Sequence, residues 1–172
     1  MSNLNEFLST YNIESYERPS IATDIAVFTV VPDTEIADCR KLPAKKLKVL
    51  LIRRGEEPFK NLWALPGGFV RKGETINQAA RRELLEETGT QQAYIEMCGT
   101  FDEEGRDPRG WIISQAFMAL INSEDKEIME NIHAGGDAKE AEWFDISLNI
   151  VGDGYECTKT DKIGRASCRE RV

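Results

Sequence analysis

The sequence predicts a mixed α/β or α+β domain, and two observations support this prediction. The first is a series of β-branched segments separated by turn residues, a pattern typical of strands in a sheet. The second is one strong helix signal, in which Thr75 is placed to cap the start and Gly89 to end the helix. At 172 residues, the chain is long enough for one domain with a sizeable core.

The first half of the chain is expected to be mostly strand. A short helix is predicted over residues 3–11, followed by a strand over 21–31, where "IATDIAVFTVV" lies between two prolines. A polar loop over 33–46 leads to a second strand over 47–54. The turn-rich segment 55–68 then leads into a short strand near Phe69.

The helix predicted from Thr75 to Thr88 divides the chain. Strands are expected after it at 93–101 and 111–121, then a charged and partly helical stretch at 123–132. The segment "HAGGDAKEAEWFDI" should begin as a loop and end in a strand near Trp143. No apolar run approaches the ~20 residues of a membrane span.

We expect residues 1–18 to form an N-terminal segment, 19–150 the domain, and 151–162 the start of a further C-terminal region. The last ten residues, "IGRASCRERV", resemble a translated sequencing-library adapter. We therefore treat 163–172 as a non-native tail that packs against nothing, with the native chain cut short near Lys162. The alternative is a natural basic tail.

Charge and cysteine usage restrict the class of protein. The formal net charge of −8 argues against a broad nucleic-acid-binding face, and an anionic substrate would need local cations. There is no CxxC pair, and His133 is the sole histidine, so a structural zinc site is not expected. Reduced cysteines in a cytoplasmic protein are the preferred interpretation. The four cysteines are Cys39, Cys98, Cys157 and Cys168.

The predicted helix carries three glutamates close together. Stepping about 100° per residue places Glu83, Glu86 and Glu87 on the same side as its apolar residues. Like charges three and four residues apart on a helix repel. Either solvent screens these carboxylates, or a cation lies between them.

The preceding loop, "LPGGFVRKGE", favours a cation. Its glycines allow the backbone to approach a ligand closely. A carbonyl from Gly67 or Gly68 together with several carboxylates makes an oxygen-only ligand set, which suits Mg²⁺ or Mn²⁺. Divalent cations would then neutralise the clustered acids.

These residues also fit a family motif. The segment "GFVRKGETINQAARRELLEETGT" resembles the Nudix box, G-x5-E-x7-R-E-U-x-E-E-x-G-U with U aliphatic. Thr90 departs from the aliphatic residue usual at the last position. The wider resemblance runs from about Arg18 to Ile146. The positions filled are Gly68, Glu74, Arg82, Glu83, Leu84, Glu86, Glu87 and Gly89.

The resemblance implies an α/β/α sandwich with a mixed sheet, and hydrolysis of a nucleoside diphosphate linked to another moiety. It implies that Glu83, Glu86 and Glu87 are metal-proximal acids, with Glu83 and Glu87 foremost as direct ligands. The Gly67 carbonyl would be a further ligand. It also implies that the remaining box residues brace the loop and helix, Glu74 and Arg82 through an ion pair. These bracing residues are Gly68, Glu74, Arg82 and Gly89.

The segment "FDEEGRDPRGWIIS" suggests the substrate. Arg106 and Arg109 flank a turn and could bind phosphates bidentately. The alternative is that Asp107 and one arginine only staple the turn. "GRDPRG" resembles the branch of the family that acts on ADP-ribose, and its relatives that sense this ligand.

The general base and the adenine site are less defined. The resemblance implies a base in a loop before a later strand, where Asp137, Glu140 and Glu142 are candidates and "EAEWF" favours Glu140. Each could instead be a solvated acid. Aromatic residues that could stack on a base, or belong to the core, are Phe59, Trp63 and Trp111.

Two functions follow as expectations. One is a metal-dependent pyrophosphohydrolase that converts ADP-ribose to AMP and ribose 5-phosphate. The other is an ADP-ribose-sensing transcriptional regulator with a C-terminal winged helix beyond this chain; the intact box favours the enzyme. Tyr11 and Tyr16 in the N-terminal segment are expected to contribute to a homodimer, by analogy with relatives.

Overall fold

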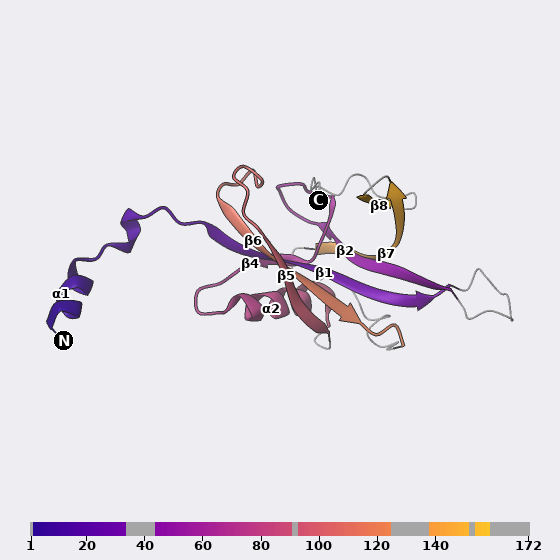
Figure 1. The fold of residues 1–172 in the computed structure, drawn as a ribbon, viewed down its shortest axis with the longest axis horizontal. Helices are drawn as coiled ribbons and strands as arrows, with labels where there is room; N and C mark the ends of the chain where they lie inside the picture. Colours follow the sequence, from indigo (N-terminus) through magenta and orange to yellow (C-terminus); the bar gives the residue numbers. More distant parts are fainter. Residues whose placement is uncertain (1, 34–43, 91–92, 125–137, 152–153, 159–172) are drawn as a thin grey trace.

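The computed structural model describes residues 2–33, 44–90, 93–124, 138–151 and 154–158. Its centre is an eight-stranded sheet with the order β5–β6–β1–β2–β7–β8, in which β3 pairs with β2 and β4 with β1 (Figure 1). The strands are β1 (Ser20–Pro32), β2 (Lys45–Arg54), β3 (Trp63–Ala64), β4 (Gly67–Phe69), β5 (Tyr94–Phe101), β6 (Ile112–Ile121), β7 (Ala138–Val151) and β8 (Gly154–Thr158).

The sheet is mixed. β1 and β6 run parallel from Ser20↔Ile112 to Thr29↔Ile121. The other described strand pairs are antiparallel. Parallel neighbours need a long connection, and here the chain between β1 and β6 contains β2, β3, β4, α2 and β5. The segment that carries the box therefore lies, in sequence, between two strands that are neighbours in the sheet.

The helix α2 (Ile76–Thr88) begins and ends where its capping residues predict. The Thr75 hydroxyl accepts a hydrogen bond from the Gln78 N–H at 3.2 Å, and the Gln78 side chain accepts one from the Thr75 N–H at 2.8 Å. Gly89 ends the helix in the left-handed conformation, with φ 74°. These caps fix the length of the helix, and so they fix which of its residues face the sheet.

The core lies between α2 and the sheet. Ala80 and Leu84 of α2 pack against buried residues of β1, β2 and β6. Truncating such a buried leucine to alanine typically costs about 2–5 kcal/mol. The strand residues of this core are Ile25, Val27, Leu50, Phe117, Ala119 and Ile121.

The opposite side of the sheet, here called the far face, is turned away from α2. Because side chains alternate along a strand, the neighbours of the core residues point to it. Asp24 lies between buried Thr23 and Ile25, and Ser114 is on the same face of the adjacent strand, since Ala22 pairs with Ser114. Ala141 and Trp143 of β7 pack towards the core, which places Glu140 and Glu142 on the far face.

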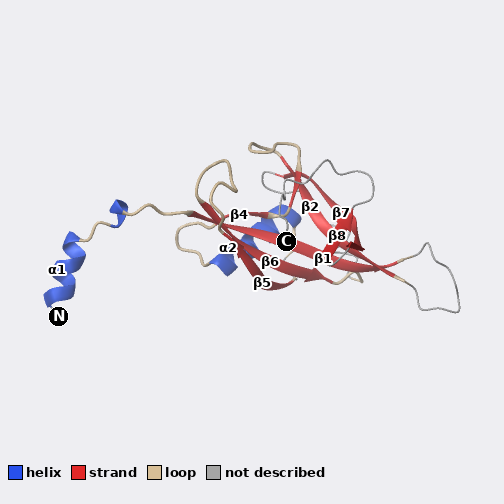
Figure 2. Cartoon of the chain, turned by 45° about the horizontal axis from the view of Figure 1, so that its top comes forward, coloured by secondary structure: helices blue, strands red, loops and turns tan. Residues whose placement is uncertain are grey.

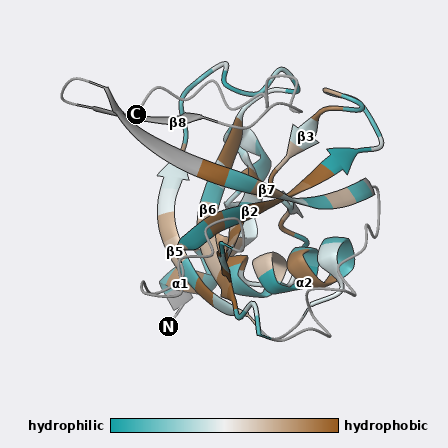
Figure 3. Cartoon of the chain, turned by 90° about the vertical axis from the view of Figure 1, so that its right-hand side faces the viewer, coloured by the Kyte–Doolittle hydropathy of each residue, from teal (hydrophilic) through white to brown (hydrophobic). Residues whose placement is uncertain are grey.

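Of the two described α-helices, one packs on the sheet and the other lies away from it. Figure 3 shows α2 against one face of the sheet, with β8 on the other side. The helix α1 (Ser2–Thr10) stands away from the sheet at the end of an extended N-terminal segment that contains a 3₁₀ turn at Ile13–Ser15 (Figure 2). None of the described helices has the length and apolar character needed to cross a membrane.

Most predicted elements are present, with three differences. β3 and β8 were not predicted, and β7 begins at Ala138, so the loop expected around Glu140 is wrong. The strand starts earlier because residues from Ala138 onward pair with β2. The predicted loop over 33–46 and the partly helical stretch over 123–132 lie largely outside the described residues, as does the tail over 163–172.

Candidate active site

Two glutamates of α2 are buried beside β4. Glu83 and Glu87 are only 9% and 8% exposed. One helical turn separates them, so they lie on the same face of α2. The Gly67 N–H donates to Glu87 Oε2 at 2.7 Å, which ties this carboxylate to the start of β4. The fold therefore brings together two of the predicted metal ligands and the predicted backbone ligand.

Gly68 lies directly against Glu83. A Cβ atom at position 68 would collide with the carboxyl carbon and both carboxylate oxygens of Glu83. Glycine is the one residue that leaves this space free, because every other side chain begins with that atom. The bracing role predicted for Gly68 thus has a steric basis at the Glu83 carboxylate.

Arg82 connects the box loop to the helix. Its Nε and Nη2 donate to the two oxygens of Glu74 at 3.0 and 2.7 Å, and Nη1 donates to Glu83 Oε1 at 2.5 Å. Nη2 also donates to the Phe69 carbonyl at 3.1 Å. The hydrogen bonds from Arg82 lower the pKa of Glu74 to about 2. The expected Glu74–Arg82 ion pair is present in the structure.

Glu86 differs from its two neighbours. Its side chain is 39% exposed and pairs with Arg71 Nη2 at 3.2 Å and with Arg82 Nη1 at 3.1 Å. Within the described part of the chain, no three acidic, cysteine or histidine side chains converge as a metal-ligand group. In this arrangement, arginines balance the charge of Glu83 and Glu86.

The donor set nevertheless fits a hard divalent cation. Next to Gly67, the chain is hydrogen-bonded to β1 through Pro66, whose carbonyl accepts from the Ile25 N–H at 2.8 Å. The Gly67 N–H is instead turned to Glu87. Since the N–H and C=O of one strand residue point to the same side, the Gly67 carbonyl is expected on this edge too. Two buried carboxylates and one carbonyl are the oxygen ligands that Mg²⁺ and Mn²⁺ prefer.

Arg109 is attached to its own turn. Its Nε and Nη2 donate to the two oxygens of Asp107 at 3.0 and 2.7 Å, which is the stapling that the sequence offered as an alternative. These bonds lower the pKa of Asp107 and raise that of Arg109. The guanidinium carbon also lies 4.8 Å from the centre of the Phe69 ring, within the range of a cation–π interaction. Asp107 thus holds Arg109 beside β4.

Arg106 points to the far face. Its Nη2 donates to the Ser114 hydroxyl at 2.7 Å, and Ser114 in turn hydrogen-bonds to Asp24. Asp24, Ser114 and Phe69 were not predicted from the sequence as site residues. The one available signal was the carboxylate of Asp24 in the middle of an otherwise apolar strand sequence.

Glu140 lies in β7, apart from the glutamates of α2. It pairs with Arg53 of β2, whose Nη1 is 3.1 Å from both carboxylate oxygens. Its side chain is 47% exposed. Glu142 lies on the same strand face, while Asp137 is outside the described residues. Glu140 therefore shares the far face with Asp24 and Ser114, and does not contact Glu83 or Glu87.

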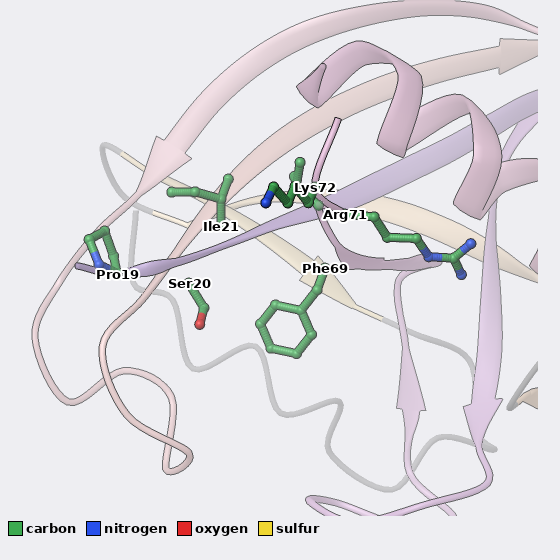
Figure 4. Close-up of a pocket in the computed structure, with 7 residues that line it drawn as sticks. Pro19, Ser20, Ile21, Phe69, Arg71 and Lys72 are labelled. Atoms are coloured by element: carbon green, nitrogen blue, oxygen red, sulfur yellow. The ribbon is translucent and has the colours of Figure 1, made fainter. Parts of the chain in front are cut away.

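The aromatic residues divide into two groups. The Trp63 ring packs edge-on against Phe144, with 4.9 Å between the ring centres, whereas Phe59 and Trp111 are 41% and 50% exposed. A shallow cavity of about 370 Å³ opens beside the end of β4. Figure 4 shows the Phe69 ring on the side of Ser20 and Arg71 extending away from it. The lining residues are Pro19, Ser20, Ile21, Phe69, Val70, Arg71 and Lys72.

Comparison with known proteins agrees with the box motif. The NUDIX domain family matches residues 37–153. An ADP-ribose pyrophosphatase of Methanocaldococcus jannaschii is 45% identical over 103 residues, covering 60% of this chain and 57% of that protein. The ADPR responsive transcriptional repressor NtrR of Acinetobacter baylyi is 36% identical over 118 residues, covering 67% and 42%. The chain thus spans about half the length of these relatives.

A solved structure has the same fold. The NUDIX domain of Shewanella oneidensis NrtR, crystallised with ADP ribose, superimposes with a TM-score of 0.63 at 27% identity, covering 81% of this chain and 80% of that one. The mixed sheet with the box helix against it is therefore confirmed as the α/β architecture expected from the motif.

Proposed function

Because the chain belongs to the NUDIX domain family, we propose that it is a pyrophosphohydrolase that converts ADP-ribose to AMP and ribose 5-phosphate with Mg²⁺ or Mn²⁺. The observation that carries this proposal is the burial of Glu83 and Glu87 against Gly67 and Gly68. Two arginines add to it, because Arg109 lies beside Phe69 of β4 and Arg106 is bonded to Ser114 of β6. The name of the M. jannaschii relative supports the substrate.

The cation would be held by Glu83, Glu87 and the Gly67 carbonyl, with Glu86 beside them. When bound, it would supply charge neutralisation at the diphosphate and help to generate the attacking hydroxide near neutral pH. Arg82 already bonds to Glu83 and Glu86, and so it keeps their carboxylates near one another before a cation binds. Glu74 fixes Arg82 in turn, which limits how far these carboxylates can move.

Arg106 and Arg109 would bind the phosphates. An arginine presents its N–H donors in a planar fork that matches phosphate oxygens. Arg109 is held by Asp107 against Phe69, and Arg106 is held by Ser114, so each guanidinium has one side fixed by the protein. The exposed rings of Phe59 and Trp111 are available for the adenine.

Glu140 would be the general base. A base must reach the attacking water within hydrogen-bond distance or through one further water. Its ion pair with Arg53 orients the carboxylate, and its 47% exposure leaves it accessible to water. Glu142 is the alternative on the same face of β7.

A second candidate function is ADP-ribose sensing by a transcriptional regulator. The A. baylyi repressor and the ADP-ribose complex of the S. oneidensis NrtR domain support it. The intact acidic box favours the enzyme, because a sensor needs the ligand site but not the metal-binding glutamates.

We further propose a homodimer in the cytoplasm. The helix α1 exposes Leu4, Phe7 and Leu8 at helical spacing, and these residues are 62%, 54% and 56% exposed. The rings of Tyr11 and Tyr16 stack beyond it at 6.0 Å. Light scattering should give a dimer mass that Leu8→Asp reduces to that of one chain. A wild-type protein of single-chain mass would contradict the dimer.

The enzyme is tested by incubating the full chain with ADP-ribose and Mg²⁺ or Mn²⁺ and resolving the products by anion-exchange chromatography. AMP and ribose 5-phosphate should form in equal amounts, and a chelator should abolish them. Tight binding of ADP-ribose without turnover under either metal would instead support the sensor.

A further inference from the structure

Asp24 is an unusual residue for the centre of a sheet. It lies on β1 between Thr23 and Ile25, both fully buried, and opposite Gly67 of β4. Burial raises the pKa of this carboxyl above its usual value. A carboxylate in such a position is costly unless it is paired and hydrogen-bonded, so its partners are informative.

Its direct partner is a hydroxyl. Asp24 hydrogen-bonds to Ser114, which β6 presents on the same face because the parallel register pairs Asp24 with Ala116 and Ala22 with Ser114. The Ser114 oxygen also accepts from Arg106 Nη2 at 2.7 Å. A hydroxyl has one proton to donate, so accepting from Arg106 leaves that proton for Asp24. The bonds therefore run in one direction, from Arg106 to Ser114 to Asp24.

Arg106 is the least satisfied of the nearby cations. Three arginines act electrostatically on Asp24, namely Arg106, Arg109 and Arg54. Arg109 is held by Asp107, and Arg54 Nε donates to the Pro58 carbonyl at 2.8 Å. Among the described residues, Arg106 Nε is buried and has no acceptor. A guanidinium anchored at one nitrogen and unpaired at another is suited to receive an anion.

We propose that Asp24 is a positioning residue for anion recognition, which acts through the Ser114 hydroxyl to hold the Arg106 guanidinium towards a phosphate group of the ligand. The identity of that ligand as ADP-ribose rests on the proposed function, but the phosphate chemistry does not. Asp24 and Ser114 would not contact the ligand. They would set the orientation in which Arg106 meets it, and so affect binding more than turnover.

The experiment compares Ser114→Ala, Ser114→Thr and Asp24→Asn in the full chain. Calorimetry measures binding of two probes, ADP-ribose and inorganic pyrophosphate, and steady-state kinetics separates KM from kcat. Thr29→Val is the matched control, because it removes a buried strand hydroxyl of the same sheet that bonds to the Ile121 carbonyl, on the α2 side.

We expect Ser114→Ala and Asp24→Asn each to weaken binding of both probes about tenfold, raising KM with kcat within about twofold. Ser114→Thr should retain wild-type affinity because it keeps the hydroxyl, and Thr29→Val should bind normally. Combining Asp24→Asn with Ser114→Ala should add little to either alone, since both interrupt one path. If Asp24→Asn fails to fold, the comparison of Ser114→Ala with Ser114→Thr still tests the proposal.

Wild-type affinity in both Ser114→Ala and Asp24→Asn would overturn the proposal, and so would a Thr variant as weak as the Ala variant. In a third outcome, the wild-type protein binds pyrophosphate but not ADP-ribose, and the two variants lose pyrophosphate binding. That result would support the positioning role and refute ADP-ribose as the substrate. A wild-type protein that binds neither probe would refute the anion site itself.

Discussion

The Glu83 carboxylate occupies the space in which a Cβ atom on Gly68 would stand. This relationship joins the second residue of β4 to the middle of α2, at the position where a cation is proposed. It is steric and does not depend on charge, so it can be tested separately from the acidity of the cluster.

Gly68→Ala should abolish most hydrolysis with a small loss of stability. The new methyl group would meet only the end of the Glu83 side chain and would displace its carboxylate, so the backbone can stay in place while the ligand geometry changes. Gly99→Ala is the control, because its Cβ would meet only the Phe101 ring at 4.0 Å. Activity assays and thermal melting of both variants check this. A fully active Gly68→Ala enzyme would contradict the close approach.

Glu87→Gln should separate activity from stability. The amide oxygen of glutamine can still accept the Gly67 N–H, and the loss of one negative charge relieves repulsion within the acidic cluster, so the metal-free melting temperature should change little. Turnover should fall by at least about 100-fold, since losing a few kcal/mol of barrier lowering has that effect. A metal titration followed by calorimetry should show weaker Mg²⁺ binding. Unchanged turnover would remove Glu87 from the ligand set.

Glu140→Gln should behave differently if Glu140 is the base. Turnover should fall by about 10²–10⁴-fold, the usual contribution of a general base, with metal affinity unchanged because Glu140 is apart from Glu83 and Glu87. Glu142→Gln provides the matched control on the same face of β7. If only Glu142→Gln is impaired, the assignment moves to Glu142.

Thr90→Val should stabilise the protein. Thr90 is 5% exposed, and its hydroxyl has no hydrogen-bond partner among the described residues. Replacing it with an apolar group of the same shape removes a cost of about 1–3 kcal/mol. The melting temperature should rise by several degrees, whereas Thr29→Val should lower it by removing the 2.9 Å bond to Ile121. Equal shifts in the two variants would show that the Thr90 hydroxyl is satisfied.

Glu74 should make stability depend on pH in acid. Its folded pKa of about 2 lies below the unfolded value of 4.5, so its contribution is fully present above pH 4.5 and is lost as pH falls towards 2. Melting temperatures measured across this window should fall more steeply for the wild type than for Glu74→Gln, which cannot titrate. Parallel curves would mean that the Arg82 pair has no net effect on folding.

Local patterns predicted much of this fold. The caps at Thr75 and Gly89 act within one helical turn, and the long strands repeat their apolar residues over many positions. β3 has two residues, too few for any alternation, and it exists because Trp63 pairs with Arg53. The start of β7 was missed for a related reason, since Ala138–Glu140 has a weak strand preference that pairing with β2 overrides.

The site follows the same division. The glutamates and glycines of the box lie close in sequence, so their spacing was informative. The path from Arg106 through Ser114 to Asp24 depends on the register between β1 and β6, which no local pattern encodes. Arg106 and Arg109 were identified from their turn, but the partner of each required the structure: Ser114 for Arg106, and Phe69 in addition to Asp107 for Arg109.

The parallel pairing of β1 with β6 has a consequence for how the molecule is made. Thr29 and Ile121, joined by a hydrogen bond, are 92 positions apart, and contacts that distant form slowly because closing so long a loop is entropically costly. During synthesis, β1 emerges early, but it cannot form its parallel pairing until β6 has been made. Asp24 and Arg106 therefore meet only when the sheet itself closes, so a nascent chain that ends before residue 112 contains the acidic box but cannot yet assemble the anion site.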